Sequence, residues 1–156
     1  MANKRGTGLL MVWVDVPADV EEEFNRWYNE EHIAERLSVP GFLSAARYMA
    51  VSGGPKYLAM YELESPAVLE SQAYKRVRDN PTEWTKRMSP GVVGTNYVRN
   101  VYQQVFPARV SRAVAQADMA PALQIGRMDV PPEVEGDFND WYNTIYVPTT
   151  RRCRAA

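Results

Sequence analysis

Residues 15–29, DVPADVEEEFNRWYN, recur 114 positions later as residues 129–143, DVPPEVEGDFNDWYN. Ten of these fifteen positions are identical, and the shared residues include a phenylalanine, a tryptophan and a tyrosine in the same order. Identity of this extent at a fixed offset is typical of an internal duplication. We therefore predict that the chain contains one complete structural unit and the first part of a second.

The second copy ends soon after the shared stretch, on a basic run of Arg151, Arg152 and Arg154. We interpret this short terminal run as a solvated tail rather than a phosphate-binding patch. The tail lacks the apolar alternation of a continuing sheet, so we expect a truncated chain or a shifted reading frame. The predicted divisions are a complete unit at 1–106, a linker at 107–121, and a partial repeat of one strand and one helix with its tail at 122–156.

Composition narrows the class of protein. Hydrophobic residues make up 46% and charged residues 24%, the balance of a globular chain. The 18 basic and 19 acidic residues nearly cancel, so no overall field favours nucleic acid or an anionic membrane. Cys153 is the only cysteine, which excludes an intramolecular disulfide. The apolar run at 9–14 is far shorter than the ~20 residues of a spanning helix, and we expect a cytoplasmic protein.

Strand and helix patterns extend outward from the first copy. A helix is expected from Pro17 to about Leu37, because apolar residues recur every three or four positions and Pro40-Gly41 follows. A second helix is expected to open at Pro66 and to stop before Asn80-Pro81. The strands are expected at residues 9–16, 42–51, 57–63 and 95–106.

This order predicts an α+β, ferredoxin-like βαββαβ fold, in which two helices cover one face of a four-stranded antiparallel sheet. The other face stays apolar and needs a partner. A second sheet, from a duplicated half or from another chain, would bury it. We therefore predict a two-sheet α/β barrel and a homodimer, with the partial second repeat attached.

Residues 24–32, FNRWYNEEH, are followed by LSVPGF at 37–42 and by Arg47-Tyr48. With this motif the chain resembles the EthD-like branch of the dimeric α/β-barrel superfamily over residues 8–106, and again over 122–146. The resemblance implies dimers and a pocket between sheet and helices that is lined by aromatic residues. Relatives include lactone isomerases, polyketide cyclases, antibiotic-type monooxygenases and haem-degrading monooxygenases, so the resemblance implies no single reaction.

His32 is the only histidine and the leading candidate for chemistry, since an unperturbed imidazole titrates near neutral pH. Tyr28 lies one helical turn before it and Arg36 one turn after it, so the three can share a face. Together they would move a proton and bind an oxyanion. The alternative is that His32 caps the C-terminal end of the helix. The second copy has Tyr146 at the equivalent position and has lost the histidine.

Six further residues are expected to bind substrate, because aromatic and basic side chains suit a cyclic or aromatic ligand. They are Trp27, Arg47, Tyr48, Tyr61, Trp84 and Tyr97. Core packing is an equal alternative for this group, and it is favoured for Trp27, which recurs as Trp141. Glu30 and Glu31 are interpreted as a solvated helix surface.

The leading functional hypothesis is a small enzyme without a cofactor, which acts by proton transfer on a hydrophobic or aromatic oxygenated metabolite. Isomerase, cyclase and lyase chemistry all fit such a site. The alternatives are a haem-binding or antibiotic-type monooxygenase and a non-catalytic ligand-binding or assembly protein. With one histidine and no cysteine pair, a zinc site would need several carboxylates, and we do not expect one. No phosphate-binding glycine loop is present.

Overall fold

The computed structural model describes residues 6–107 and 111–150, so the lone cysteine and the basic tail lie outside the described residues. The complete unit consists of β1 (Gly8–Asp15), α1 (Glu21–Trp27), a π-helical turn η1 (Tyr28–His32), α2 (Ile33–Leu37), β2 (Phe42–Met49), β3 (Tyr57–Leu63), a 3-10 turn η2 (Pro66–Glu70), α3 (Gln72–Asp79), α4 (Glu83–Met88), α5 (Pro90–Val93) and β4 (Thr95–Gln103). It is followed by α6 (Arg112–Gln116), α7 (Glu135–Trp141), a second π-helical turn η3 (Tyr142–Tyr146) and α8 (Val147–Thr150).

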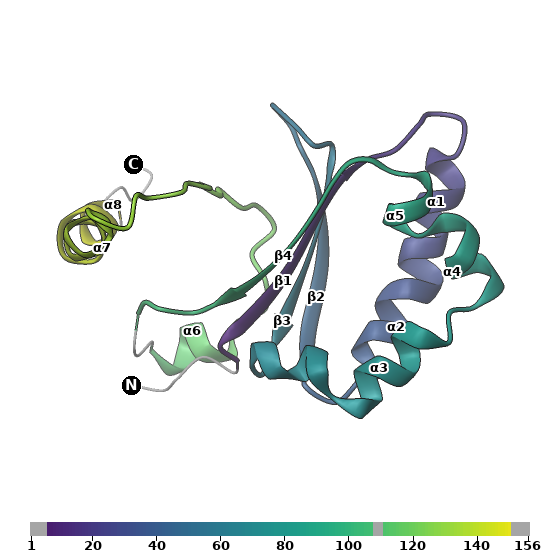
Figure 1. Ribbon diagram of the computed structural model, residues 1–156, viewed down its shortest axis with the longest axis horizontal. Helices are drawn as coiled ribbons and strands as arrows, with labels where there is room; N and C mark the ends of the chain where they lie inside the picture. Colours follow the sequence, from purple (N-terminus) through teal and green to yellow (C-terminus); the bar gives the residue numbers. More distant parts are fainter. Residues whose placement is uncertain (1–5, 108–110, 151–156) are drawn as a thin grey trace.

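The four strands form one antiparallel sheet in the order β2-β3-β1-β4. The helices α1 to α5 lie on one side of this sheet, as Figure 1 shows. The predicted βαββαβ order and ferredoxin-like α+β class are confirmed. Among the described residues, no helix is long and apolar enough to cross a membrane.

The first helical segment runs without a break through α1, η1 and α2 and ends at Leu37, as predicted. It begins at Glu21 rather than at Pro17, because residues 17–20 form a turn in which the Val20 amide donates to the Pro17 carbonyl. Glu21 and its two acidic successors occupy the first turn, where negative charge is favoured by the helix dipole. After the helix, Gly41 adopts a φ of 93°, which favours glycine.

The second predicted helix is divided in two. Pro66–Glu70 forms the 3-10 turn η2, and α3 starts afresh at Gln72. The Ser71 hydroxyl accepts a hydrogen bond from the Tyr74 amide at 3.1 Å and so caps α3. Serine is a preferred N-cap residue, and this local bond explains why the segment does not continue as one helix.

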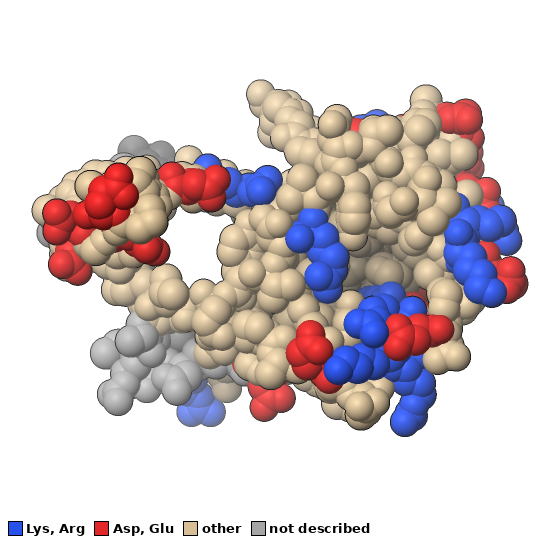
Figure 2. Space-filling model, in the orientation of Figure 1, with Lys and Arg blue, Asp and Glu red and all other residues tan. Residues whose placement is uncertain are grey.

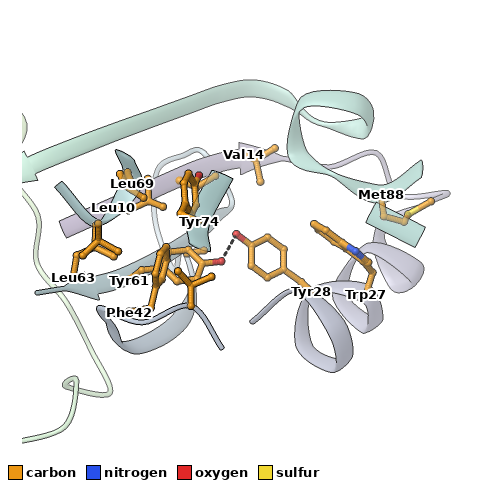
Figure 3. Packing of buried hydrophobic residues seen from close by; sticks show 14 of the residues in the cluster. Leu10, Val14, Trp27, Tyr28, Phe42, Tyr61, Leu63, Leu69, Tyr74 and Met88 are labelled. Carbon is orange, nitrogen blue, oxygen red and sulfur yellow. Dashed lines mark hydrogen bonds between the residues drawn. The ribbon is translucent and has the colours of Figure 1, made fainter. Parts of the chain in front are cut away.

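Side chains of β1 alternate between two apolar clusters. Leu10, Val12 and Val14 face the helices and join the main core, in which Tyr28 and Tyr61 are among the least exposed residues (Figure 3). On the opposite face, the buried members of a smaller cluster are Met11, Trp13 and Leu58. Leu9, Tyr48, Met60, Val98 and Tyr102 pack around it and are partly buried. Both faces of the sheet are therefore apolar, and the helices cover one of them.

The segment after β4 has helices but no strand. Residues 122–128, where the strand of the partial repeat was expected, form no β-strand, because an extended segment needs a hydrogen-bonded neighbour and this one pairs with none. The helical segment α7-η3-α8 stands away from the sheet, at the left of Figure 1. Figure 2 shows acidic side chains gathered on it.

Both copies of the repeated sequence have the same local structure. The second π-helical turn begins and ends 114 residues after the first, at Tyr142 and Tyr146. The copies differ in packing, since Trp27 has no exposed surface whereas Trp141 is 45% exposed. The duplication and the domain boundaries drawn from it stay a prediction.

Candidate active site

A cavity of about 620 Å³ lies between the helices and the sheet. This volume is typical of pockets that hold small organic ligands. Leu10, Val12 and Tyr61 line its inner part and are almost fully buried. Tyr97 and Val101 of β4 line its outer part and are 43% and 40% exposed. The cavity therefore opens to solvent beside β4, and Figure 2 shows a hollow between sheet and helices with basic side chains next to it.

The cavity brings together five of the predicted site residues. They are Tyr28, His32, Arg36, Tyr61 and Tyr97. The three proposed catalytic side chains are all in this group. They come from one continuous helical segment, so the spacing along the first helix correctly predicts a shared cavity wall.

The other four predicted residues do not line this cavity. Trp27 is buried in the core, and its Nε1 donates to the Thr85 hydroxyl at 3.1 Å. Trp84 Nε1 donates to a carboxylate on α1. Tyr48 lies on the opposite face of the sheet, where its hydroxyl donates to the Ala120 carbonyl.

Arg47, the fourth, extends from β2 across the aromatic rings of the first helix. Its guanidinium donates to Asn25 Oδ1 at 2.7 Å and to Asn29 Oδ1 at 2.8 Å, and it lies 4.4 Å from the centre of the Tyr28 ring. Arg47 therefore fixes the helix on the sheet and stands behind a cavity residue. It acts on the site through its charge rather than by contact with a ligand.

His32 lies within the helical segment and not at its end. The helix continues from His32 to Leu37, and the C-cap residue is Ser38, so the alternative interpretation of His32 as a helix cap is wrong. The imidazole packs against two aromatic rings, with centroids 4.6 Å from Trp27 and 4.9 Å from Tyr28. Its Nδ1 is buried without a hydrogen-bond partner, 3.9 Å from Glu35 Oε2.

The π-helical turn sets this arrangement. In η1 the Ile33 amide donates to the Tyr28 carbonyl, five residues back, which places one extra residue in the turn. Such turns are rare and frequently occur at functional sites. The wider turn lets both Trp27 and Tyr28 contact the same imidazole, whereas α-helical neighbours lie three or four residues apart.

The electrostatic environment keeps His32 neutral. Burial lowers the pKa of His32 to about 3, together with the positive charges of Arg36 and Arg47. At neutral pH the ring is therefore an uncharged imidazole, with one nitrogen able to accept a proton. Protonation requires a compensating negative charge in the cavity.

A pair of buried phenols lies next to the histidine. The Tyr61 hydroxyl donates to the Tyr28 hydroxyl oxygen at 3.0 Å (Figure 3). Burial raises the pKa of Tyr28 to about 12 and raises the pKa of Tyr61 well above its usual range. Both phenols stay protonated at neutral pH. They therefore act as hydrogen-bond donors and not as bases.

Arg36 brings a cation into the cavity. Its side chain is 12% exposed, and its Nη1 is buried without a hydrogen-bond partner. Its Nη2 lies 3.7 Å from Glu35 Oε2, too far for a good hydrogen bond. Burial raises the pKa of Glu35. The guanidinium thus keeps donor capacity for a ligand.

Most of the other lining residues were not predicted, among them Arg99, Val101 and Tyr74. Arg99 and Val101 lie on the same side of β4 as Tyr97, and the two-residue period of a strand would have identified them once Tyr97 was chosen. Tyr74 of α3 is buried, and no motif in the sequence marks it. Over residues 6–107 and 111–150, no three His, Cys, Asp or Glu side chains gather to hold a metal ion.

Residues 8–115 match a protein family described as a domain of unknown function, DUF4286. The chain belongs to this family. The DUF4286 match spans the whole four-stranded sheet and every residue that lines the cavity. No curated protein matches the chain significantly.

Solved structures similar to this DUF4286 protein share its fold. A dimeric ferredoxin-like protein from an uncultured marine organism is 16% identical, with a TM-score of 0.51, over 68% of this chain and 94% of that one. An EthD family protein from Bacillus halodurans is 12% identical, with a TM-score of 0.47, over 64% and 99%. The heme-degrader MhuD from Mycobacterium tuberculosis, with two hemes in its active site, is 18% identical, with a TM-score of 0.46, over 65% and 99%. The first of these likenesses shows the ferredoxin-like fold that the predicted resemblance implies.

Proposed function

We propose that this protein is a small enzyme that transfers a proton on a hydrophobic or aromatic oxygenated metabolite held in the cavity, with no cofactor. The reaction is an isomerisation, a cyclisation or a lyase step. The observation that carries the proposal is a buried, neutral imidazole that shares a cavity with protonated phenols and a guanidinium that has a free donor.

His32 is the proton acceptor in this proposal. A neutral imidazole takes a proton from a carbon or oxygen acid most readily when the resulting charges are compensated. Tyr28 donates a hydrogen bond, and Arg36 supplies a positive charge, to the oxyanion that forms as the proton leaves. Fixed donors aimed at a developing oxyanion stabilise the transition state more than the ground state.

Tyr61 positions the donor. Its hydroxyl donates to the Tyr28 oxygen, which leaves the Tyr28 hydrogen free to point into the cavity. Leu10 and Val12 supply an apolar surface for the hydrocarbon part of the substrate. This combination favours a small oxygenated ring compound over a polar metabolite such as a sugar.

Haem binding is the second candidate, and the state of His32 favours it, because neutral imidazole is the form that ligates a metal. A carboxylate near the other ring nitrogen, here Glu35, is a common partner of a ligating histidine. Arg36 would face the acidic groups of a porphyrin. Haem bound in this way would supply redox and oxygen chemistry.

We also propose a homodimer formed on the face of the sheet opposite the helices. Met11, Trp13 and Leu58 are already buried there within one chain, because the segment after β4 contacts this face through Ala120 and Arg127. The residues around them, such as Leu9, Met60 and Val98, are only partly buried and leave apolar surface for a partner. A second copy of the chain, placed face to face, would complete a two-sheet barrel. The cytoplasmic location expected from the sequence stays a prediction.

The test is a thermal-shift screen of the wild type and His32→Gln with small aromatic, lactone and polyketide-like compounds, and with haem. A compound that stabilises the wild type and not the variant supports a working site at His32, and its conversion is then followed by mass spectrometry. A Soret band that needs His32 favours the haem alternative. Equal responses of both proteins to every compound contradict the proposal and favour a non-catalytic binding protein.

A further inference from the structure

We propose that the cavity binds a ligand through a carboxylate, held between Arg36 of α2 and Arg99 of β4 beside the Tyr74 hydroxyl. The inference rests on the proposed function of the same cavity and adds to it the class of substrate, an organic acid. It concerns the end of the ligand that is fixed, and not the atom that loses a proton.

The first argument is the unused donor on Arg36. A buried guanidinium nitrogen without a hydrogen bond costs free energy, and native structures rarely leave one without a partner. The neighbouring acid, Glu35, lies at 3.7 Å and does not line the cavity. Arg36 lines the cavity, so a ligand oxygen bound there would lie beside this guanidinium and give it an acceptor.

The second argument is that Tyr74 joins two arginines from opposite walls. Arg36 Cζ lies 5.6 Å from the centre of the Tyr74 ring, and Arg99 Nη2 donates to the Tyr74 hydroxyl at 3.3 Å. One guanidinium comes from the helical layer and the other from the sheet. Two arginines around one phenol form a cluster of donors that suits a planar carboxylate.

The third argument is the balance of charge. The cavity lining also includes Glu70 and Arg78, and each has its own partner outside the cavity. Glu70 pairs with Lys75 at 3.2 Å, and Arg78 pairs with Asp79 at 2.7 Å. Arg36 and Arg99 therefore dominate the charge in the cavity, and an anion is the ligand that they favour.

The rest of the lining favours a carboxylate over a phosphate. Leu10, Val12 and Leu69 give the inner cavity an apolar surface, which suits the ring or chain of an aromatic or aliphatic acid. A phosphate monoester carries more charge and needs more donors than two guanidiniums and a phenol provide. A single negative charge matches the site better.

Such a ligand would also raise the pKa of His32. Its charge would offset the positive field that disfavours an imidazolium, so a bound acid would make His32 more basic. The charged and titratable groups that face the imidazole are Arg36, Arg47, Glu35, Tyr28 and Tyr61. The proposed carboxylate thus fixes the substrate and helps the acceptor in the same step.

The test compares benzoate with its neutral isostere benzamide and with phenyl phosphate, by calorimetry and by NMR of the single imidazole. We expect benzoate to bind at least tenfold more tightly than benzamide, because a hydrogen bond to a charged group adds about this factor. Benzoate should also raise the pKa of His32. Arg36→Gln should weaken the binding of benzoate about tenfold and leave the binding of benzamide unchanged. Arg26→Gln is the matched control, since Arg26 lies over Trp84 and does not line the cavity.

Each other outcome has a definite meaning. Equal binding of benzoate and benzamide, or tighter binding of phenyl phosphate, overturns the carboxylate site and leaves the proton-transfer proposal standing. An Arg36→Gln protein that binds benzoate as the wild type does also overturns the site. If benzoate, benzamide and phenyl phosphate all fail to bind at concentrations on the order of 10 mM, both this inference and the proposed function of the cavity are contradicted.

Discussion

The low pKa of His32 makes the stability of the protein depend on pH in a defined direction. Burial lowers that pKa from an ordinary value of about 6.5 to about 3 in the folded protein. Between these values the unfolded chain binds a proton that the folded chain does not. The free energy of unfolding therefore falls as pH is lowered through this window, and the full contribution is present above about pH 6.5.

The size of the effect follows from the shift. Each pH unit inside the window is worth at most about 1.4 kcal/mol. From pH 6.5 to pH 5 this gives about 2 kcal/mol. The side chain is 12% exposed, so we discount this figure and expect a loss of about 1–2 kcal/mol.

The assay is urea unfolding of the wild type and His32→Gln at pH 7.0, 6.0 and 5.0. Glutamine is neutral throughout, so the wild type should lose about 1–2 kcal/mol relative to the variant over this range. Other titrating groups are present in both proteins and largely cancel. NMR of the imidazole in the folded protein should show no titration above pH 5. A folded-state pKa between 6 and 7, or the same pH slope in both proteins, would refute the reasoning.

Three more predictions concern packing and assembly. Glu31→Ala should lower the unfolding free energy by about 1–3 kcal/mol, because Glu31 Oε1 accepts hydrogen bonds from an indole and two threonine hydroxyls. Glu30→Ala, at an exposed position, is the control, and it should leave the unfolding free energy almost unchanged in the same urea titration. Arg47→Met should lower the unfolding free energy by about 2–4 kcal/mol, because two hydrogen bonds and the ring contacts of Arg47 are lost. It should also raise the pKa of His32, as measured by NMR. An unchanged midpoint of unfolding contradicts this prediction. Light scattering after size-exclusion chromatography should give twice the 17.7 kDa chain mass for the wild type. Met60→Lys, on the sheet face opposite the helices, should give a lower mass, with Met49→Lys as the exposed control. A monomeric wild type at micromolar concentration rules out the homodimer.

The sequence predicts the sheet well, because hydrophobic alternation reports which side of a strand is buried. The third strand is found at the predicted residues 57–63, and the first helix ends where Pro40-Gly41 requires it. The break in the second helix at Ser71 was not predicted, and the strand expected at residues 122–128 does not form. A cap competes locally with helix continuation, and a strand depends on a partner that no local pattern reveals.

The sequence predicts the cavity residues that lie on one helix, but not those that other elements supply. Helical spacing correctly places Tyr28, His32 and Arg36 on one cavity wall. Residues supplied by other elements, such as Tyr74, depend on tertiary packing. Glu31 was interpreted as solvated surface, yet its carboxylate joins η1 to α4 through the Thr85 hydroxyl. A charged residue that accepts several hydrogen bonds cannot be told from an exposed one by its neighbours in sequence.

The π-helical turn at Tyr28–His32 determines which side of the helix the residues after it face, and single substitutions leave this orientation unchanged. Removal of one residue from this turn would rotate everything after it by about 100°, while leaving the composition of the helix almost the same. Arg36 would then leave the cavity, although no residue in contact with a ligand had been replaced. An insertion or deletion within these five positions is therefore a single-step route by which related chains can point a different side chain at the same cavity.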